Sequence, residues 1–468
     1  MRPRVLEIDF RDDARLIDPM ICYSARWVLP VTTAPIANGT VAVQDGMIAY
    51  VGPTAGSPEG QAVDLGDAVI LPGLVNAHTH LELTVMRGFL EDLSFVDWIG
   101  KLRRGRNEVL TLESLLDSAR LGINEGIRAG VTSYADTCST GVVMQAMREA
   151  GVRGIMYQEV FAPAPALAQP ALDELAARLE LLGKDVTDLV ALGVSPHAPY
   201  TVSEELYAAV SRLSRERNLP LAMHIAESAE EDDLVRRGTG PFAELWNRRE
   251  IQVPIPGVNR SPIALLERHD LLREDSLLIH AIRVDAEDIR LIAEHDCAVA
   301  HCPISNAKLG HGVAPLTDLL SRGIRVGLGS DSMASNNRMD ILEEARMALL
   351  GQRARLQKHD AITAGDVLSL ATIGGARALG LQERIGSLEV GKDADVAAFG
   401  ITHDKALPGV DPIATTVFAL GGTDALLTVV KGRELVRDGR VLVEDDGVRR
   451  RCMETGAALA AWAQANGF

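Results

Sequence analysis

The sequence predicts an α/β fold: a (β/α)8 TIM-type barrel with a small β-sandwich domain built from both ends of the chain. Two observations carry this prediction. Across residues 72–376, apolar runs rich in β-branched residues alternate with long amphipathic stretches, which is typical of βα units repeated around a parallel sheet. Across residues 1–71 and 377–468, short strand-like runs and turn residues dominate instead. We therefore expect the barrel to be inserted into the small domain, whose second half is followed by a C-terminal tail.

Eight barrel strands are expected, one for each βα unit. Their ranges are 68–78, 130–135, 152–161, 190–195, 219–225, 276–281, 298–301 and 324–330. In the N-terminal flank, the pair Asp45-Gly46 lies between two strand-like runs and predicts a tight hairpin. The connection 234–271 is longer than most barrel loops and rich in glycine and proline, so it is a candidate lid.

Composition and charge exclude several classes of protein. A chain of 468 residues with 47% apolar and 24% charged residues can form a large catalytic domain and a smaller second unit. The formal net charge of -17 repels phosphate backbones and anionic lipids, which argues against a nucleic-acid or membrane role. The five cysteines form no CxxC pair, no stretch has the length of a membrane span, and the N-terminal residues lack the apolar core of a secretory signal. We expect a cytoplasmic protein that acts on a small molecule, and a homo-oligomer is compatible with the sequence.

The strongest chemical signal is the motif HTH at residues 78–80, which follows the first apolar run. Residues two apart on a strand face the same way, so both His78 and His80 can reach one cation. An isolated HxH pair is weak evidence for a metal. His224, His280 and Asp331 strengthen it, because each ends an apolar run and such enzymes build their sites at the carboxyl ends of barrel strands. These five side chains form the candidate metal centre.

Two further histidines and one glutamate lie on the same face of the predicted barrel. For His197 in SPHAPYT and His301 in AHCPISN, substrate contact and a structural hydrogen bond are equally supported. Glu227 lies three residues beyond His224, which places it to act as an acid where the chain leaves the strand. The alternative for Glu227 is a surface carboxylate at the start of the acidic helix that follows.

In their order along the chain, the motifs resemble the amidohydrolase superfamily, in the branch of nucleoside deaminases and triazine hydrolases. They span nearly the whole chain and are LPGLVNAHTHLE, SPHAPYT, MHIAES, LLIHA, HCPISNAKLG, GLGSDSMASNN, ATIGGARALG and IGSLEVGKDADVAAF. The resemblance implies metal ligation by four side chains: His78, His80, His224 and Asp331. Two-metal members carry a bridging lysine on the fourth strand, and VALGVSPHAPYT has none, so one divalent ion is expected. Zinc is the commonest choice for such ligands, and Fe²⁺ or Mn²⁺ would tolerate them.

The same resemblance implies the catalytic roles. A divalent cation lowers the pKa of a bound water towards about 7 and so supplies a nucleophile at neutral pH. Glu227 would deliver a proton to the ring nitrogen beside the attacked carbon. Asp331 would accept the proton of the water, and His280 would orient that water and stabilise the developing charge.

Substrate contacts are expected from the loops around this site. Trp98 in FVDWIGKL resembles a tryptophan that stacks on the substrate ring, with a core aromatic residue as the alternative. Ser335 resembles a contact near the reacting centre, with a helix cap as the alternative. Glu82 in HTHLE replaces a glutamine of guanine deaminase-like members and favours a donor-rich partner such as ribose hydroxyls. His197 completes the set of expected substrate-binding residues.

The weaker likeness of HTHLELT, FVDWI and GTGPF to aminodeoxyfutalosine deaminases favours deamination of a 6-aminopurine carried on a ribose-like group. The candidate substrates are aminodeoxyfutalosine, adenosine, adenosylhomocysteine and methylthioadenosine. Two alternatives use the same residues: displacement of chloride or an amine from an s-triazine or another aromatic heterocycle, and guanine-type deamination. A non-catalytic scaffold is disfavoured because every expected ligand is present. The zinc deaminases with a PCxxC signature are excluded, since the chain has no CxxC.

Overall fold

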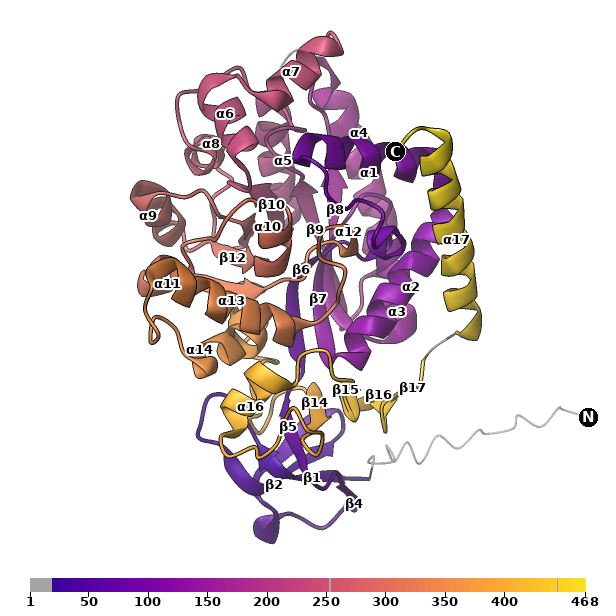
Figure 1. Ribbon diagram of the computed structural model, residues 1–468, viewed down its shortest axis with the longest axis vertical. Coiled ribbons are helices and arrows are strands. Elements are labelled where there is room, and N and C mark those ends of the chain that lie inside the picture. The colour runs from indigo at the N-terminus through magenta and orange to yellow at the C-terminus, as the bar shows by residue number, and fades with distance from the viewer. Residues whose placement is uncertain (1–18, 252–253, 444) are drawn as a thin grey trace, which may run out of the picture.

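The computed structural model describes residues 19–251, 254–443 and 445–468, and at its centre is a barrel of eight parallel strands (Figure 1). The strands follow one another around the barrel in chain order: β6 (Leu74–Thr79), β7 (Val131–Cys138), β8 (Arg153–Val160), β9 (Val190–Pro196), β10 (Leu221–Ile225), β11 (Ser276–His280), β12 (Ala298–His301) and β13 (Arg325–Leu328). The chain after β13 returns to β6, because the backbone N–H of Asp331 donates to the carbonyl of His78 over 2.9 Å. The predicted barrel class is confirmed.

Helices surround the barrel strands, and their apolar faces pack on them (Figure 1). In the described residues the α-helices are α1 (Phe95–Val109), α2 (Leu112–Arg128), α3 (Val142–Ala150), α4 (Ala168–Leu182), α5 (Glu204–Arg217), α6 (Ala229–Arg237), α7 (Pro241–Arg248), α8 (Pro262–Arg268), α9 (Ala286–Glu294), α10 (Pro303–Lys308), α11 (Leu316–Ser321), α12 (Met333–Asn336), α13 (Ile341–Leu356), α14 (Ala364–Ser369), α15 (Gly375–Ala378), α16 (Pro412–Ala419) and α17 (Asp446–Ala465). Shorter helical turns are η1 (Thr54–Gly56), η2 (Leu81–Met86), η3 (Pro165–Leu167), η4 (Gly183–Asp185) and the π-type turn η5 (Leu370–Gly374).

The first predicted strand, 68–78, is two strands in the structure. The part before Gly73 is β5 (Ala68–Pro72), which belongs to the small domain, and the part after it is β6 of the barrel. Gly73 lies against β7 so closely that a Cβ atom on it would come within 2.2 Å of Thr132 Oγ1. Both halves are fully buried, and apolar residues run from the first half into the start of the second, so hydrophobic pattern alone did not separate them.

The small domain is a mixed sheet made from both ends of the chain, as predicted (Figure 1). Its strands are β1 (Ile21–Val28), β2 (Ile36–Gln44), β3 (Met47–Pro53), β4 (Gln61–Asp64), β5, β14 (Val396–Gly400), β15 (Leu427–Val430), β16 (Arg433–Arg437) and β17 (Arg440–Val441), hydrogen-bonded into one sheet. The two ends meet where β5 pairs antiparallel with β14. The predicted hairpin is present between β2 and β3, with φ of 51° at Asp45 and 75° at Gly46, as a type I′ turn requires.

A buried arginine joins the barrel to the small domain. Arg153 at the start of β8 is 1% exposed, and its Nε donates to Asp395 Oδ2 over 2.9 Å. Its Nη2 donates to Asp393 Oδ2 over 2.8 Å. Both carboxylates lie on the chain entering β14, so this ion network fixes how the sheet sits beneath the barrel.

The C-terminal tail is the long helix α17, which packs along the barrel helices α1 and α2 (Figure 1). Trp462 donates through Nε1 to Glu108 Oε2 on α1 over 2.8 Å. Leu459 is buried in an apolar cluster with Leu83 and Met86 of η2. The helix therefore braces the segment that follows the first barrel strand.

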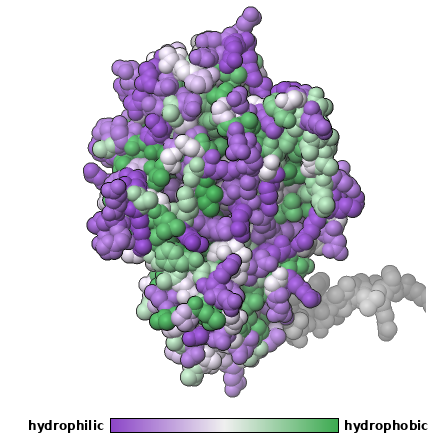
Figure 2. All heavy atoms as spheres, in the orientation of Figure 1, coloured by the Kyte–Doolittle hydropathy of each residue, from purple (hydrophilic) through white to green (hydrophobic). Residues whose placement is uncertain are grey.

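The candidate lid, 234–271, contains the end of α6 and the helices α7 and α8, while its residues 252–253 lie outside the described range. Its movement as a lid stays a prediction. Within the described segments, no helix combines the length and apolar character needed to cross a membrane. The face drawn in Figure 2 carries mainly hydrophilic side chains, interspersed with smaller apolar patches.

Candidate metal centre and active site

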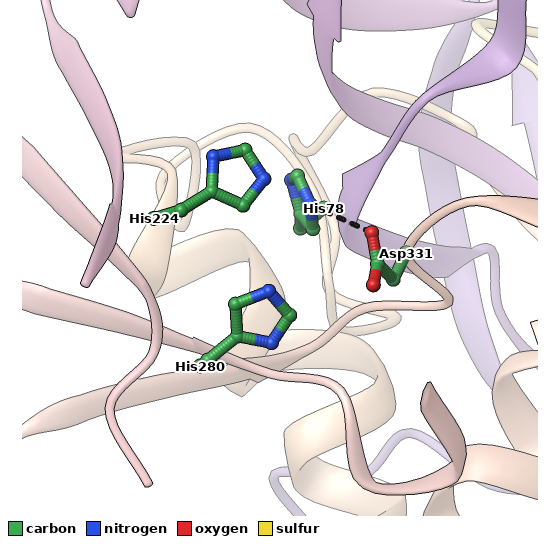
Figure 3. Close-up of side chains that lie close together, drawn as sticks. All are labelled: His78, His224, His280 and Asp331. Carbon is green, nitrogen blue, oxygen red and sulfur yellow. Dashed lines mark hydrogen bonds and ion pairs between the residues drawn. The ribbon is translucent and has the colours of Figure 1, made fainter. Parts of the chain in front are cut away.

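Four metal-ligand side chains converge at one end of the barrel. The ligand atoms of His78, His224, His280 and Asp331 all lie within 4.8 Å of one another. Figure 3 shows the three imidazoles and the carboxylate facing one common space. The histidines come from the carboxyl ends of β6, β10 and β11, and Asp331 follows β13, which is where barrel enzymes carry their sites.

His80 lies beside this cluster. Its Nε2 is 3.1 Å from His224 Nε2 and 3.6 Å from Asp331 Oδ1, while His78 Nε2 is 3.2 Å from the same carboxylate oxygen. Two ligands that each lie about 2.0–2.1 Å from one zinc ion, at angles of about 90–120°, are about 2.8–3.6 Å apart. The spacing of these donors therefore fits a single divalent cation.

The protonation states suit a cation as well. Burial lowers the pKa of His78 to about 4 and holds the pKa of His224 well below its ordinary value, so both imidazoles are neutral and keep a lone pair for a metal. Burial alone would raise the pKa of Asp331. The 3.2 Å contact with His78 Nε2 and the neighbouring histidines outweigh it and hold the pKa of Asp331 well below its usual range.

Hydrogen bonds with surrounding residues orient Asp331 and His280. Asp331 Oδ2 accepts from the hydroxyl of Ser305 over 2.6 Å and from that of Ser335 over 3.0 Å. His280 Nδ1 donates to Asn306 Oδ1 over 2.9 Å, which leaves its Nε2 lone pair turned towards the site. His280 and Asp331 have φ of 77° and 56°, a left-handed conformation that only a few per cent of non-glycine residues adopt.

Glu227 is buried beside the cluster. Its side chain is 5% exposed, Oε1 lies 3.5 Å from His280 Nε2, and Oε2 accepts from the hydroxyl of Tyr200 over 3.3 Å. Burial, together with the nearby Asp331, raises the pKa of Glu227 well above its ordinary value. The alternative of a surface carboxylate does not describe this residue, because α6 is capped by Ser228 and Glu227 lies before it. Glu227 is thus a buried group able to carry a proton.

A cavity of about 930 Å³ opens onto the cluster. Its wall includes His80, Glu82, Trp98, Glu159, His197, Glu227, His280 and Asp331. Trp98 on α1 lies beside Phe95 at 6.2 Å between ring centroids, and both rings line the cavity. The volume is suited to a small molecule.

The predicted substrate contacts occupy different places. Trp98 and His197 face the cavity, whereas Ser335 is fully buried on Asp331 and is not part of the cavity wall. Glu82 lies in the wall but is bound by Arg106, whose Nη2 is 3.2 Å from Glu82 Oε1.

His301 does not reach the cavity wall, and neither of its ring nitrogens has a hydrogen-bond partner in the described part of the chain. It is 1% exposed at the end of β12. Of the two alternatives that the sequence left open for it, substrate contact and a structural hydrogen bond, the described structure shows neither.

Several functional neighbours were not singled out from the sequence: Arg106, Glu159, Tyr200, Asn306, Ser305 and His311. Three of them stand in quoted motifs, Tyr200 in SPHAPYT and both Ser305 and Asn306 in HCPISNAKLG. Glu159 stands at the carboxyl end of the predicted strand 152–161, the same position that selected the histidines, so a signal for it was present. Arg106 lies within a helix, where nothing local distinguishes it from a solvated arginine.

The barrel, with a His/Asp cluster at its strand ends that is consistent with a divalent metal, has the architecture of a barrel hydrolase. The model of the amidohydrolase family matches residues 69–435. The chain belongs to this family. The expected class of enzyme, a hydrolase acting on carbon–nitrogen bonds, is thereby confirmed.

Named relatives cover almost the whole chain. It is 32% identical over 439 residues to a 5-methylthioadenosine/S-adenosylhomocysteine deaminase of Desulforudis audaxviator, covering 92% of this chain and 97% of that protein. It is 34% identical over 412 residues to the protein of that name from Nitratidesulfovibrio vulgaris (strain Hildenborough), covering 86% and 88%.

Two solved structures have the same overall fold as this chain. An adenosine deaminase from Xanthomonas campestris with bound zinc superposes with a TM-score of 0.85 at 27% identity, covering 94% of this chain and 98% of that one. An atrazine chlorohydrolase from Arthrobacter aurescens, also with zinc, superposes with a TM-score of 0.79 at 22% identity, covering 94% and 100%, and shows the shared fold.

Proposed function

We propose that this protein hydrolytically deaminates the 6-aminopurine of a nucleoside-like substrate and releases ammonia. The candidate substrates are aminodeoxyfutalosine, adenosine, adenosylhomocysteine and methylthioadenosine. The observation that carries the proposal is a buried, protonatable Glu227 beside the His/Asp cluster, at the end of a cavity sized for a small molecule. The named deaminase relatives support it.

One divalent cation, with zinc as the first choice, would be held by His78, His80, His224 and Asp331. When bound, it would supply the nucleophile by lowering the pKa of a water towards about 7. The donor spacing supports this assignment, and zinc is present in the solved adenosine deaminase. His280 Nε2 is left outside this set of four.

The chain's own residues would move the protons. Glu227 would give its proton to the ring nitrogen beside the amino-bearing carbon, which makes that carbon more electrophilic. It would then relay to the departing amine the proton that Asp331 takes from the water, and would regain its own proton from the hydroxyl group left on that carbon. Asp331 would take a proton from the attacking water. His280, whose Nδ1–H is held by Asn306, would accept a hydrogen bond from that water through Nε2 and so orient it.

The cavity would exclude bulk water from these steps. Tyr200 and Trp246 are buried behind Glu227, and Trp246 Nε1 donates to the carbonyl of Tyr200 over 2.9 Å. Trp98 would lie against a flat purine ring, because its side chain forms part of the cavity wall.

Displacement of chloride or an amine from a triazine uses the same residues, but its solved relatives match this chain only in fold. Guanine-type deamination is less well supported, because guanine deaminase-like members carry a glutamine where this chain has Glu82. One assay distinguishes all three. Zinc-loaded protein is offered the four nucleosides, guanine and atrazine, and ammonia and chloride release are recorded. Release of ammonia from a 6-aminopurine nucleoside is expected, and release from none of the nucleosides at full metal occupancy would contradict the proposal.

A further inference from the structure

Besides Glu227, two buried glutamates line the cavity, Glu82 and Glu159, and they differ in what they already contact. Glu82 is saturated. Its Oε1 accepts from Arg106 over 3.2 Å and from the Ser139 hydroxyl over 2.8 Å, and its Oε2 accepts from Cys138 over 3.2 Å and from the Thr140 hydroxyl. A carboxylate held by this many donors has little capacity left for a ligand.

Glu159 is the opposite case. Its side chain is 6% exposed at the end of β8, and Oε1 has no hydrogen-bond partner in the described part of the chain. The nearest oppositely chargeable group is His197, whose Nε2 lies 4.0 Å away. A buried polar atom without a partner is uncommon in a native protein and calls for an explanation. Here the carboxyl group borders the cavity, so a ligand can supply the missing contact.

The tautomer of His197 follows from its neighbours. The hydroxyl of Thr201 donates to the carbonyl of Ala198 over 3.1 Å, so its oxygen is the acceptor in the 2.8 Å contact with His197 Nδ1. Nδ1 therefore carries the proton, and Nε2 presents a lone pair. Glu159 and His197 thus offer two hydrogen-bond acceptors 4.0 Å apart on the cavity wall.

A second cation does not explain this pair, although ligand atoms of Glu159, His197 and His224 lie within 4.8 Å of one another. His224 Nδ1 donates to the carbonyl of His197 over 3.3 Å, and its Nε2 faces His80 in the main cluster. A neutral imidazole has one lone pair, which His224 uses in that cluster. Two ligands would remain, too few for a built metal site.

We propose that Glu159 and His197 bind the vicinal diol of the substrate's ribose, each accepting a hydrogen bond from one hydroxyl. The two neighbouring O–H donors of a vicinal diol match two acceptors at this separation. A ligand carboxylate or phosphate has only acceptors and would find no donor in this pair. The inference rests on the proposed function. It assigns the recognition of ribose hydroxyls, which the sequence suggested for Glu82, to Glu159 instead.

The test compares ligands that differ by one hydroxyl. Zinc-loaded wild type, Glu159→Leu and Glu159→Gln are titrated by calorimetry with inosine, 2′-deoxyinosine and 3′-deoxyinosine, and kcat/KM is measured for the matching adenosines. Wild type is expected to lose roughly 10- to 100-fold in affinity for one deoxy analogue, because the buried Oε1 of Glu159 is then left without a hydrogen-bond partner. Glu159→Leu should bind that analogue and the ribonucleoside equally, and Glu159→Gln should show an intermediate ratio. Glu82→Gln is the matched control, and its ratio between the ligands should stay that of wild type.

Zinc content and melting temperature establish that each variant is folded and loaded. A Glu159→Leu protein that keeps the wild-type ratio between ribose and deoxyribose ligands overturns the inference alone. If Glu82→Gln instead abolishes the preference for ribose over deoxyribose ligands, ribose recognition belongs to Glu82, and the inference is overturned. Wild type that neither binds nor deaminates any of these nucleosides contradicts the proposed function as well.

Discussion

At the level of single residues, Glu227 is the side chain on which the proposed chemistry depends most directly. It is the carboxyl group that faces both His280 and the cavity, with Oε1 3.5 Å from His280 Nε2. Burial, together with the nearby Asp331, raises the pKa of Glu227 well above the ordinary value and so favours the protonated form, whereas a solvated glutamate is ionised at neutral pH. A proton donor is needed where the ring nitrogen of a purine would lie.

Glu227→Gln should therefore keep the metal and lose turnover. General acid–base catalysis contributes about 10²- to 10⁴-fold, so kcat should fall by that factor while bound zinc stays at the wild-type amount. Both are measured on the same preparation, by ammonia release and by elemental analysis. Tyr200→Phe is the control, since it removes only the 3.3 Å hydrogen bond to Glu227 and should lower kcat about 10-fold or less. A Glu227→Gln protein with more than a tenth of wild-type kcat would place the acid elsewhere.

The site residues that could be predicted from the sequence are those at the ends of barrel strands. His78, His80, His224, His280 and Asp331 all end apolar runs, and the barrel brings the ends of its strands together. The role suggested for Glu82 could not be tested from sequence, because its partner Arg106 comes from a helix whose orientation only the folded chain fixes.

At the level of helices and strands, the junction between β5 and β6 decides where the small domain ends and the barrel begins. The chain crosses from one sheet to the other at Gly73, directly against Thr132 of β7. The sequence predicted one strand here because apolar residues continue on both sides of Gly73, from Ala68–Leu71 to Leu74–Val75. A hydrophobic pattern predicts that a residue is buried, but it does not predict in which of the two sheets the residue lies.

Gly73→Ala should destabilise the protein. An added Cβ would lie 2.2 Å from Thr132 Oγ1 and 2.7 Å from its Cβ, so one of the two strands must shift. Overpacking of this kind costs about 1–3 kcal/mol, to be measured as a lower urea midpoint. Adding Thr132→Gly removes the clashing side chain and should recover part of the loss. Gly100→Ala on α1, where a Cβ meets nothing within 4 Å, should leave the midpoint unchanged or raise it. Equal midpoints for Gly73→Ala and wild type would show that the junction is less tightly packed than the structure implies.

In the molecule as a whole, the barrel and the small domain are joined by a buried ion network as well as by apolar packing. Arg153 of β8 holds Asp393 and Asp395, and Asp395 also accepts from the backbone N–H of Lys431 over 2.8 Å. Arg153 is more than 200 positions from both carboxylates in the chain. The sequence predicted that both chain ends share one domain, but no local pattern could pair an arginine with carboxylates so distant.

Arg153→Met should lower the free energy of unfolding by about 3–5 kcal/mol, because the buried Asp395 loses its arginine partner and Asp393 keeps only Arg384, whose Nε donates to it over 2.9 Å. The measurement is thermal or urea unfolding with zinc present. Arg290→Met removes an exposed arginine paired within α9 and should change stability by about 0.5 kcal/mol or less. An Arg153→Met protein as stable as the Arg290→Met control would mean that the network does not hold the domains together.

The proposed function, nucleoside deamination, depends above all on one cation bound in the His/Asp cluster. The decisive experiment is a zinc titration of metal-free protein with ammonia release from adenosine, or from the best substrate of the panel, as the readout. Activity should be absent without metal, rise in proportion to added zinc, and reach its plateau at one equivalent per chain. Deamination by the metal-free protein, or a plateau only at two equivalents, would contradict the role of a single cation.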